Sequence, residues 1–208
     1  MTKASTPRCA HWRQAVPAGL SGAARDWVVQ TDSLTRALQA CGQFRVHCLH
    51  QGLAPVHADE WRALGLTRPG QVWQREVLLW LNDQPVVFAH TVVPLHHTAY
   101  DWPFFSELGH QSLGSALFSD PLIQRQALYF SHLLGKHPLL QKAQHALSTP
   151  LNSGKLTLAS SGPQAQFAHT GCYARRSVFT RRQARMLVSE VFLPALFTAV
   201  SQPLLASR

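Results

Sequence analysis

The stretch Val72-Trp73-Gln74-Arg75-Glu76-Val77-Leu78-Leu79-Trp80-Leu81 predicts a strand that contains an anomaly. Side chains in a strand alternate between two faces. One of these faces carries four large apolar side chains and a single charge: Trp73, Arg75, Val77, Leu79 and Leu81. A guanidinium cannot be neutralised, and burying it among apolar groups costs free energy unless a partner anion faces it. We therefore expect a partner anion close to Arg75.

Residues 186–193 repeat this pattern with the opposite charge. Glu190 shares its predicted face with Met186, Val188 and Phe192. Two readings satisfy both buried charges. In one, Arg75 and Glu190 form a buried salt bridge with each other; in the other, both face a site for a small polar ligand.

The composition is typical of a globular protein, because 46% of the 208 residues are apolar and only 14% are charged. This length suits one domain with a sizeable core. The net charge is +9, but the basic residues are scattered. Their one cluster, between Arg175 and Arg185, carries few aromatic residues, so the charge does not favour a nucleic-acid partner.

Neither the cysteines nor the apolar runs indicate export or membrane insertion. The four cysteines show no CxxC motif, which favours reduced thiols in the cytosol. Residues 1–14 lack the apolar segment of a signal peptide. The longest strongly apolar run, residues 77–81, is far too short to cross a bilayer. We expect a soluble, cytoplasmic, monomeric protein.

Turn and capping residues divide the chain into short helices and longer strands. A helix is expected after Thr31-Asp32-Ser33, ending at Gly42. Strands are expected over residues 44–53, 72–81, 86–93, 172–180 and 186–193. The turn formers Asn82-Asp83-Gln84-Pro85 join the second and third strands into an antiparallel hairpin.

The remaining segments are expected to be helical or irregular. Short helices are predicted over residues 58–64 and 112–118, and a longer helical segment over 122–147, interrupted near Pro138. Residues 148–163 are rich in Ser, Thr, Gly and Pro and predict a loop. The fold class is therefore α+β.

Twelve histidines raise the question of a metal site, but their spacing does not support one. On a strand His47 and His50 face opposite sides, and the adjacent His96 and His97 diverge. No set of Cys, His and carboxylate residues has convergent spacing, so we expect no metal. Neither GxGxxG nor a P-loop is present, and we expect no cofactor.

One group of residues could bind a ligand and provide acid chemistry. Arg75 is a cation that can hold a carboxylate, and the predicted helix start at Leu113-Gly114 offers unpaired backbone N–H groups. Glu190 is an acid in apolar surroundings, where desolvation favours its protonated form. Such a set suits a small aromatic or cyclic carboxylate.

Several stretches, taken in order, resemble the successive motifs of the chorismate pyruvate-lyase family, the ubiquinone-pathway enzymes that form 4-hydroxybenzoate. They are Trp73-Gln74-Arg75-Glu76-Val77-Leu78-Leu79, Thr91-Val92-Val93-Pro94, Leu113-Gly114-Ser115-Ala116-Leu117-Phe118, Ala174-Arg175-Arg176-Ser177 and Ser189-Glu190-Val191-Phe192-Leu193-Pro194-Ala195. Asp26-Trp27 followed by Asp32-Ser33-Leu34-Thr35 is similar too. The resemblance covers roughly residues 26–118 and 172–195.

The resemblance implies one chorismate-lyase-like domain over residues 1–208, with a single antiparallel sheet of about six strands and helical flaps over an internal ligand cavity. It implies that Arg75 and the backbone of Leu113 hold the ring carboxylate, that Glu190 lies at the opposite end, and that Leu34 belongs to a flap. Arg75 and Glu190 would be the catalytic residues.

Three departures from the family pattern stand out. Leu34 replaces a Met, which is a tolerable apolar exchange. Ala89-His90 replaces an expected Gly-Arg, which removes a permanent positive charge near the cavity. Residues 119–171 form an unusually long segment, which we expect to be a helical or loop insertion.

The function that the resemblance implies is cofactor-independent elimination of pyruvate from chorismate. Chorismate and 4-hydroxybenzoate would be the small-molecule partners. The alternative is a sensor-like domain of the same fold that binds an aromatic acid without transforming it, as in some transcriptional regulators. A third reading is that Arg75 and Glu190 only pair in the core.

Overall fold

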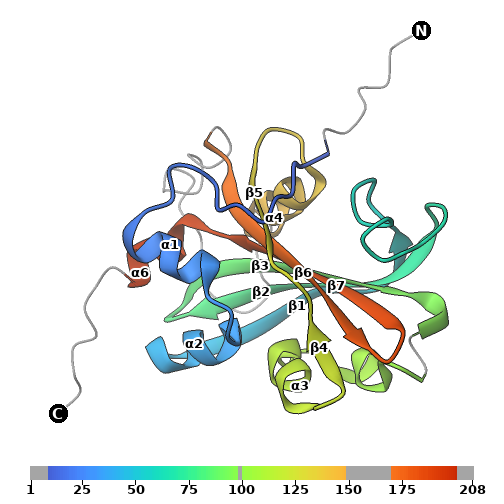
Figure 1. Ribbon diagram of the computed structural model, residues 1–208. Helices are drawn as coiled ribbons and strands as arrows, with labels where there is room; N and C mark the ends of the chain where they lie inside the picture. The colour runs from blue at the N-terminus through green and yellow to red at the C-terminus, as the bar shows by residue number, and fades with distance from the viewer. Residues whose placement is uncertain (1–8, 98–99, 149–169, 201–208) are drawn as a thin grey trace, which may run out of the picture.

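The structure, a computed structural model, describes residues 9–97, 100–148 and 170–200 (Figure 1). Its strands are β1 (Phe44–Pro55), β2 (Gln71–Leu81), β3 (Gln84–Pro94), β4 (Ile123–Arg125), β5 (Tyr129–Leu133), β6 (Cys172–Arg181) and β7 (Ala184–Phe192). Its α-helices are α1 (Gly22–Val29), α2 (Leu34–Cys41), α3 (Leu113–Ser119), α4 (Pro138–Ser148) and α6 (Pro194–Val200). Two short 3-10 helices, η1 (Leu95–His97) and η2 (Pro103–Glu107), follow β3. The predicted α+β class is confirmed.

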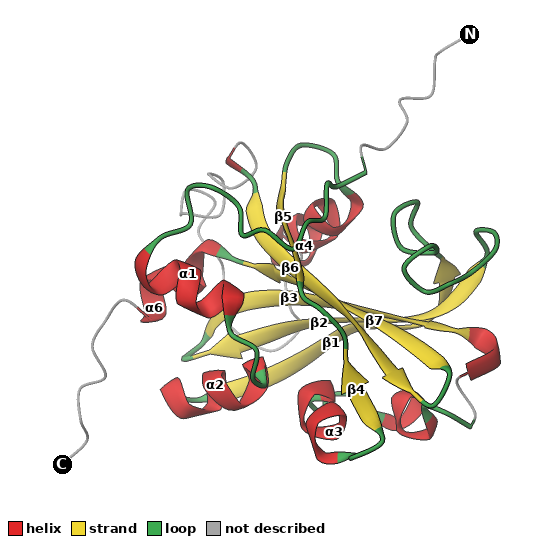
Figure 2. Cartoon of the chain, in the orientation of Figure 1, coloured by secondary structure: helices red, strands yellow, loops and turns green. Residues whose placement is uncertain are grey.

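All the strands belong to one antiparallel sheet, which crosses the centre of the molecule (Figure 2). Its order is β1-β2-β3-β7-β6-β4, and β5 also pairs with β6. Because β4 pairs with one end of β6 and β5 with the other, the two short strands occupy successive parts of the same edge. The sheet is therefore six strands wide, as expected, although seven strands build it.

The hairpin between β2 and β3 turns at Asn82 and Asp83, as the sequence predicts. Both residues have positive φ angles, 48° and 62°, which is the geometry of a tight two-residue hairpin turn. The side chain of Asn82 also accepts a hydrogen bond from the backbone N–H of Gln43, at 2.9 Å. This contact ties the turn to the start of β1.

The central strands divide their apolar side chains between two cores. Val77, Leu79 and Val87 belong to a core that includes residues of α1, α2 and α6. Leu78 and Phe88 belong to another core, built with α4. Neighbouring residues of β2 therefore face opposite sides, so the predicted alternation is confirmed.

One predicted helix is wrong, and a second is right only after its predicted interruption near Pro138. Residues 58–65 form turns, because their backbone bonds span either three or four residues and do not repeat as in an α-helix. Residues 123–133 form β4 and β5, because they lie along the open edge of β6, and pairing with that edge overrides their local helix preference. Within residues 122–147, the helix α4 begins only at Pro138.

The segment 119–171 is described as far as residue 148 and again from residue 170. Its described part contributes to the sheet through β4 and β5, and α4 buries Leu139, Leu140 and Leu147 in the core that contains Phe88. Most of the predicted loop over 148–163 lies outside the described residues. In the described part of the chain, no helix combines the length and apolar character needed to span a membrane.

Candidate active site

A cavity lies over the sheet face that carries Arg75, between the strands and the helices α2 and α3. It holds about 60 Å³ of space open to a water molecule, several times what one water needs. The four residues predicted to contact a ligand all line it: Leu34, Arg75, Leu113 and Glu190. The structure therefore brings together residues from two unpaired strands, β2 and β7, and two separate helices.

Arg75 is almost fully buried, with 2% of its surface exposed. Its Nη2 donates hydrogen bonds to the carbonyl oxygens of Gly109, at 2.9 Å, and Gln111, at 2.7 Å. Its Nε is buried and has no hydrogen-bond partner among the described residues. Burial lowers the pKa of Arg75, but a guanidinium stays charged at neutral pH. A buried cation with an unused donor therefore lines the cavity.

Glu190 enters the cavity from β7 and has its own counter-ion. The Nε of Arg175, on β6, donates to the Oε2 of Glu190 at 2.5 Å. Arg175 is held in turn by the backbone carbonyls of Val28 and Gln30, at 3.2 and 2.6 Å. The expectation that apolar surroundings alone set the charge of Glu190 is therefore incomplete, because a buried guanidinium contacts it.

Arg75 and Glu190 are not paired with each other among the ion pairs of the described residues. The strand β3 lies between them: Arg75 is opposite Thr91, and Glu190 is opposite Ala89. Two strand spacings separate their backbones by about 10 Å. The two charges thus lie at different ends of the cavity floor, and the direct salt-bridge reading is wrong.

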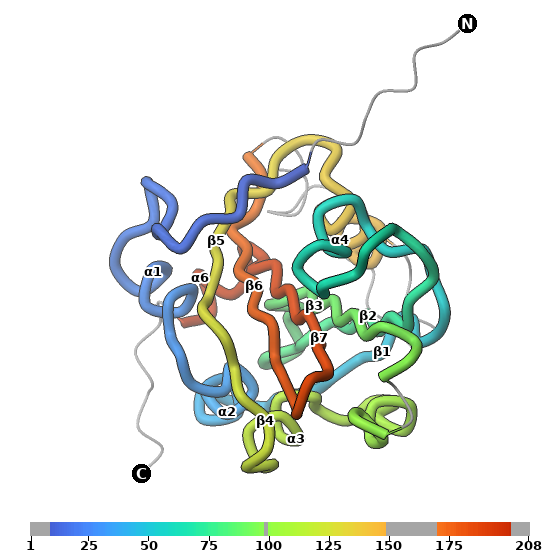
Figure 3. The backbone as a smooth tube through the Cα atoms, turned by 45° about the vertical axis from the view of Figure 1, so that its right-hand side comes forward, coloured from blue at the N-terminus to red at the C-terminus, as the bar shows by residue number. Residues whose placement is uncertain are grey.

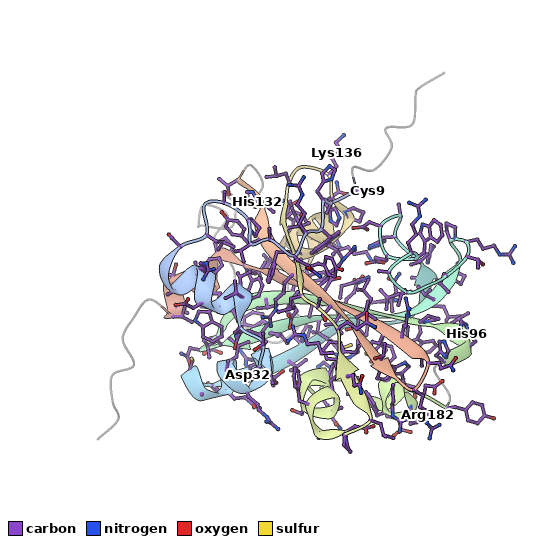
Figure 4. All side chains as sticks on the ribbon, in the orientation of Figure 1. Cys9, Asp32, His96, His132, Lys136 and Arg182 are labelled. Atoms are coloured by element: carbon purple, nitrogen blue, oxygen red, sulfur yellow. The ribbon has the colours of Figure 1, made fainter. Side chains whose placement is uncertain are left out.

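The cavity is covered by α2 and α3, which contact each other. The Ser33 hydroxyl caps α2 by accepting a hydrogen bond from the N–H of Arg36 at 3.4 Å, as the capping residues predict. Asp32, which comes just before this cap, is labelled in Figure 4 and also lines the cavity. The hydroxyls of Thr35 and Ser112 lie 2.7 Å apart and join the two helices.

Close approach of the two helices depends on Gly114. A Cβ atom at this position would lie 2.6 Å from the Thr35 hydroxyl oxygen, nearer than real side chains approach. A glycine permits this contact because it lacks a Cβ. The lid over the cavity therefore has a specific sequence requirement at residue 114.

Two arginines that line the cavity were not assigned from the sequence. Arg175 belongs to a quoted motif, and strand alternation places it on one face of β6 with Ser177 and Phe179, so a signal existed. Arg125 comes from the segment predicted as a helix, and nothing in the sequence aims it at the cavity. Burial and the neighbouring Arg175 lower the pKa of Arg125 to about 10, and its Nε has no hydrogen-bond partner among the described residues.

The dipeptide Ala89-His90 is divided between the two faces of the sheet. Ala89 lines the cavity, whereas His90 belongs to the opposite face, where its Nδ1 lies 3.2 Å from the Oε1 of Glu76. Burial opposes a charge on His90, but Glu60 and Glu76 raise its pKa to about 9. The expected loss of a positive charge near the cavity is therefore wrong, because the side chain of residue 90 faces away from the cavity.

Comparisons with known proteins agree with this architecture. The family model described as "Chorismate lyase" matches residues 6–202. A protein of Ralstonia nicotianae named "Probable chorismate pyruvate-lyase" is 47% identical over 172 residues, which cover 82% of this chain and 80% of the relative. One of Nitrosomonas eutropha with the same name is 40% identical over 195 residues, covering 93% of this chain and 98% of the relative.

A solved structure shares the fold at low sequence identity. The effector domain of PhnF from Mycobacterium smegmatis has a TM-score of 0.51 and 14% identity, covering 81% of this chain and 92% of that domain. This similarity concerns the fold alone. Because the family model spans nearly the whole chain and relatives reach 47% identity, the resemblance seen in the sequence is confirmed, and this chain belongs to the chorismate lyase family.

Proposed function

We propose that the chain eliminates pyruvate from chorismate and releases 4-hydroxybenzoate. Family membership supports a lyase acting on chorismate. The observation that carries the proposal is the buried Arg75, which lines the cavity and whose Nε–H has no hydrogen-bond partner among the described residues. A carboxylate is the natural acceptor for such a donor, since charge-assisted hydrogen bonds are short and strong.

The ring carboxylate would bind Arg75, with the backbone N–H of Leu113 as a second donor. Leu34, buried in α2, would cover the ring from the flap. This orientation directs the other end of the ring toward Glu190, because Arg75 and Glu190 lie on opposite sides of β3. Binding therefore fixes which ring atoms meet which charged group.

Chorismate carries a second carboxylate on its enolpyruvyl side chain, and the cavity offers cations for it. Arg125 and Arg175 line the same cavity as Glu190, and the Nε of Arg125 is buried without a hydrogen-bond partner in the described part of the chain. Three arginines and two acids, Asp32 and Glu190, give the lining a positive balance. The lining therefore favours an anionic ligand.

The reaction breaks the C–O bond between the ring and the enolpyruvyl group, the ring loses one hydrogen, and the leaving group gains a proton to become pyruvate. Aromatisation drives the step, so the protein mainly orients the substrate and positions a proton. Arg75 anchors the carboxylate, and Glu190, ion-paired with Arg175, takes the proton lost by the ring and passes it to the leaving side chain, or hydrogen-bonds the ring hydroxyl. These steps need only side chains, so we propose that no metal or organic cofactor takes part.

A single assay tests this proposal. Purified protein is mixed with chorismate, and 4-hydroxybenzoate and pyruvate are measured together against a boiled sample. Equal amounts of both products are expected. Thermal stabilisation by 4-hydroxybenzoate without turnover would instead favour the sensor-like binder, and neither effect would reject both functions.

We further propose that the chain acts as a cytoplasmic monomer in the first committed step of ubiquinone biosynthesis, without nucleic-acid partners. A strain that lacks the chain should then lose ubiquinone and regain it when fed 4-hydroxybenzoate. Light scattering should give the mass of one chain, 23.1 kDa. Persistent ubiquinone in the deletion strain would contradict the pathway assignment.

A further inference from the structure

Three polar side chains converge on the sheet face opposite the cavity. His57 and Glu60 belong to the segment between β1 and β2, and His90 belongs to β3. Figure 3 shows this connecting segment, in teal, on the side of the strands away from α1 and α2. The Nδ1 of His57, the Oε1 of Glu60 and the Nε2 of His90 are all buried, and both nitrogens face this one carboxylate oxygen.

The spacing of these atoms matches a metal site. The Nε2 of His90 lies 3.2 Å from the Oε1 of Glu60, and the Nδ1 of His57 lies 3.4 Å from the same oxygen. All three atoms lie within 4.8 Å of one another. Tetrahedral coordination with zinc bonds near 2.0–2.2 Å separates neighbouring ligand atoms by about 3.3–3.6 Å. The His57 and His90 rings are stacked with their planes 7° apart, so the His57 ring must rotate before both nitrogens can point at one ion.

The outer atoms of two of the three side chains, His90 and Glu60, are held in the way metal ligands are. The Nδ1 of His90 lies 3.2 Å from the Oε1 of Glu76, which also contacts Lys142. The other oxygen of Glu60 accepts a hydrogen bond from the backbone N–H of His57, at 3.1 Å. A carboxylate behind a ligating imidazole fixes its tautomer and increases its basicity.

We propose that His57, Glu60 and His90 form a binding site for one divalent transition-metal ion, with Zn²⁺ the best match. Two imidazole nitrogens and one carboxylate oxygen are a typical zinc set, and a water completes the tetrahedron. The ion fastens the turns over residues 58–65 to β3. The sheet separates it from the cavity, so it stabilises the fold and takes no part in the proposed elimination.

The three residues also show why sequence spacing did not reveal a metal site. His57 and Glu60 are three residues apart, but His90 is far along the chain and joins them only because β3 pairs with β2. The prediction that no His and carboxylate set converges is therefore wrong for these three residues.

Zinc titration of the full chain tests the site. The protein is freed of metal by dialysis against a chelator and titrated with ZnCl₂ in competition with a chromophoric zinc indicator. His57→Ala removes the least buried ligand, and His11→Ala removes an exposed histidine outside the cluster as a matched control. We expect one zinc per wild-type and His11→Ala chain, and about 100-fold or more weaker binding by His57→Ala.

Melting temperatures provide a second readout, since an ion that binds only the folded chain raises its melting temperature. Zinc should stabilise the wild type and His11→Ala but not His57→Ala. Wild-type protein that binds no zinc, or equal affinity in all three proteins, overturns the proposal. If His57→Ala does not fold, X-ray absorption of zinc-loaded wild type decides: two imidazole ligands support the site, and sulfur ligands or a single imidazole reject it.

Discussion

Arg75 and Glu190 enter the same cavity from strands that β3 separates, and each contacts a different group. Arg75 binds two backbone carbonyls, while Glu190 binds Arg175. The two charges are therefore satisfied separately and leave the space between them open to a guest. This arrangement is what a ring with different groups at its two ends requires.

Arg75→Ala should weaken the binding of 4-hydroxybenzoate. The substitution removes the charged donor that we assign to the carboxylate, and a hydrogen bond to a charged group contributes about 1.5–3 kcal/mol. The dissociation constant measured by calorimetry should then rise about 10- to 150-fold. Arg25→Ala, which removes an exposed arginine of α1, is the matched control and should bind like the wild type. Equal affinity of Arg75→Ala and wild type would mean that another group holds the carboxylate.

Glu190→Gln should reduce turnover more than binding. The amide keeps the size of the side chain but can neither form the ion pair with Arg175 nor carry a proton from the ring to the leaving group. Loss of a positioned acid–base group lowers turnover by about 10²- to 10⁴-fold. The dissociation constant of 4-hydroxybenzoate should change far less.

Glu107→Gln, at an exposed position of η2, controls for the loss of one carboxylate. Circular dichroism of both variants should match the wild type. Unchanged turnover in Glu190→Gln would remove this residue from the mechanism and leave Arg175 as the main group at that end of the cavity.

Strand alternation made the central part of the site predictable. It places Arg75 with Val77 and Leu79 on one face, and Glu190 with Val188 on one face, and the structure confirms both. The alternation of β2 and β7 follows from the sequence because both strands are central and carry large apolar residues. His90 shows the limit of this kind of prediction. Alternation gives the face of the sheet on which His90 lies, but it does not reveal that Glu60 and Glu76 are its neighbours.

Arg125 shows why the outer part of the site could not be predicted from the sequence. Its segment is polar enough to suit a helix, and only the open edge of β6 makes it a strand. The pairing of Glu190 with Arg175 likewise depends on the register between β6 and β7, which a single sequence does not reveal. Contacts between segments distant in the chain determine where Arg125 lies and which residue pairs with Glu190. Local periodicity alone determines which faces of the central strands Arg75 and Glu190 occupy.

Gly114→Ala should open the lid over the cavity. Its new Cβ would lie 2.6 Å from the Thr35 hydroxyl oxygen, so α2 and α3 must separate. We expect a KM for chorismate raised several-fold and faster release of 4-hydroxybenzoate in stopped-flow measurements. Gly70→Ala is the matched control, because a Cβ there meets nothing within 4 Å.

A second substitution tests the cause of this effect. Thr35→Ala removes the oxygen that the new methyl group would meet, so the double variant should recover part of the wild-type KM. A Gly114→Ala enzyme with wild-type KM and release rate would show that the lid tolerates the methyl group. A double variant no better than Gly114→Ala would assign the defect to the helix itself.

Cys172 should resist thiol reagents in the folded protein. The residue is 3% exposed in the core built around α4, and burial raises the pKa of its thiol to about 12. The reactive thiolate is therefore scarce at pH 8. Cys9, by contrast, is exposed and should react quickly. Peptide mass spectrometry after brief treatment with iodoacetamide should find Cys9 modified and Cys172 intact, and denaturant should abolish the difference.

Cys9→Ser should remove the fast reaction, while Cys172→Ala should leave it unchanged. Rapid modification of Cys172 in the native chain would show that the core opens on the timescale of the reaction, contrary to the close packing of α4 against the sheet.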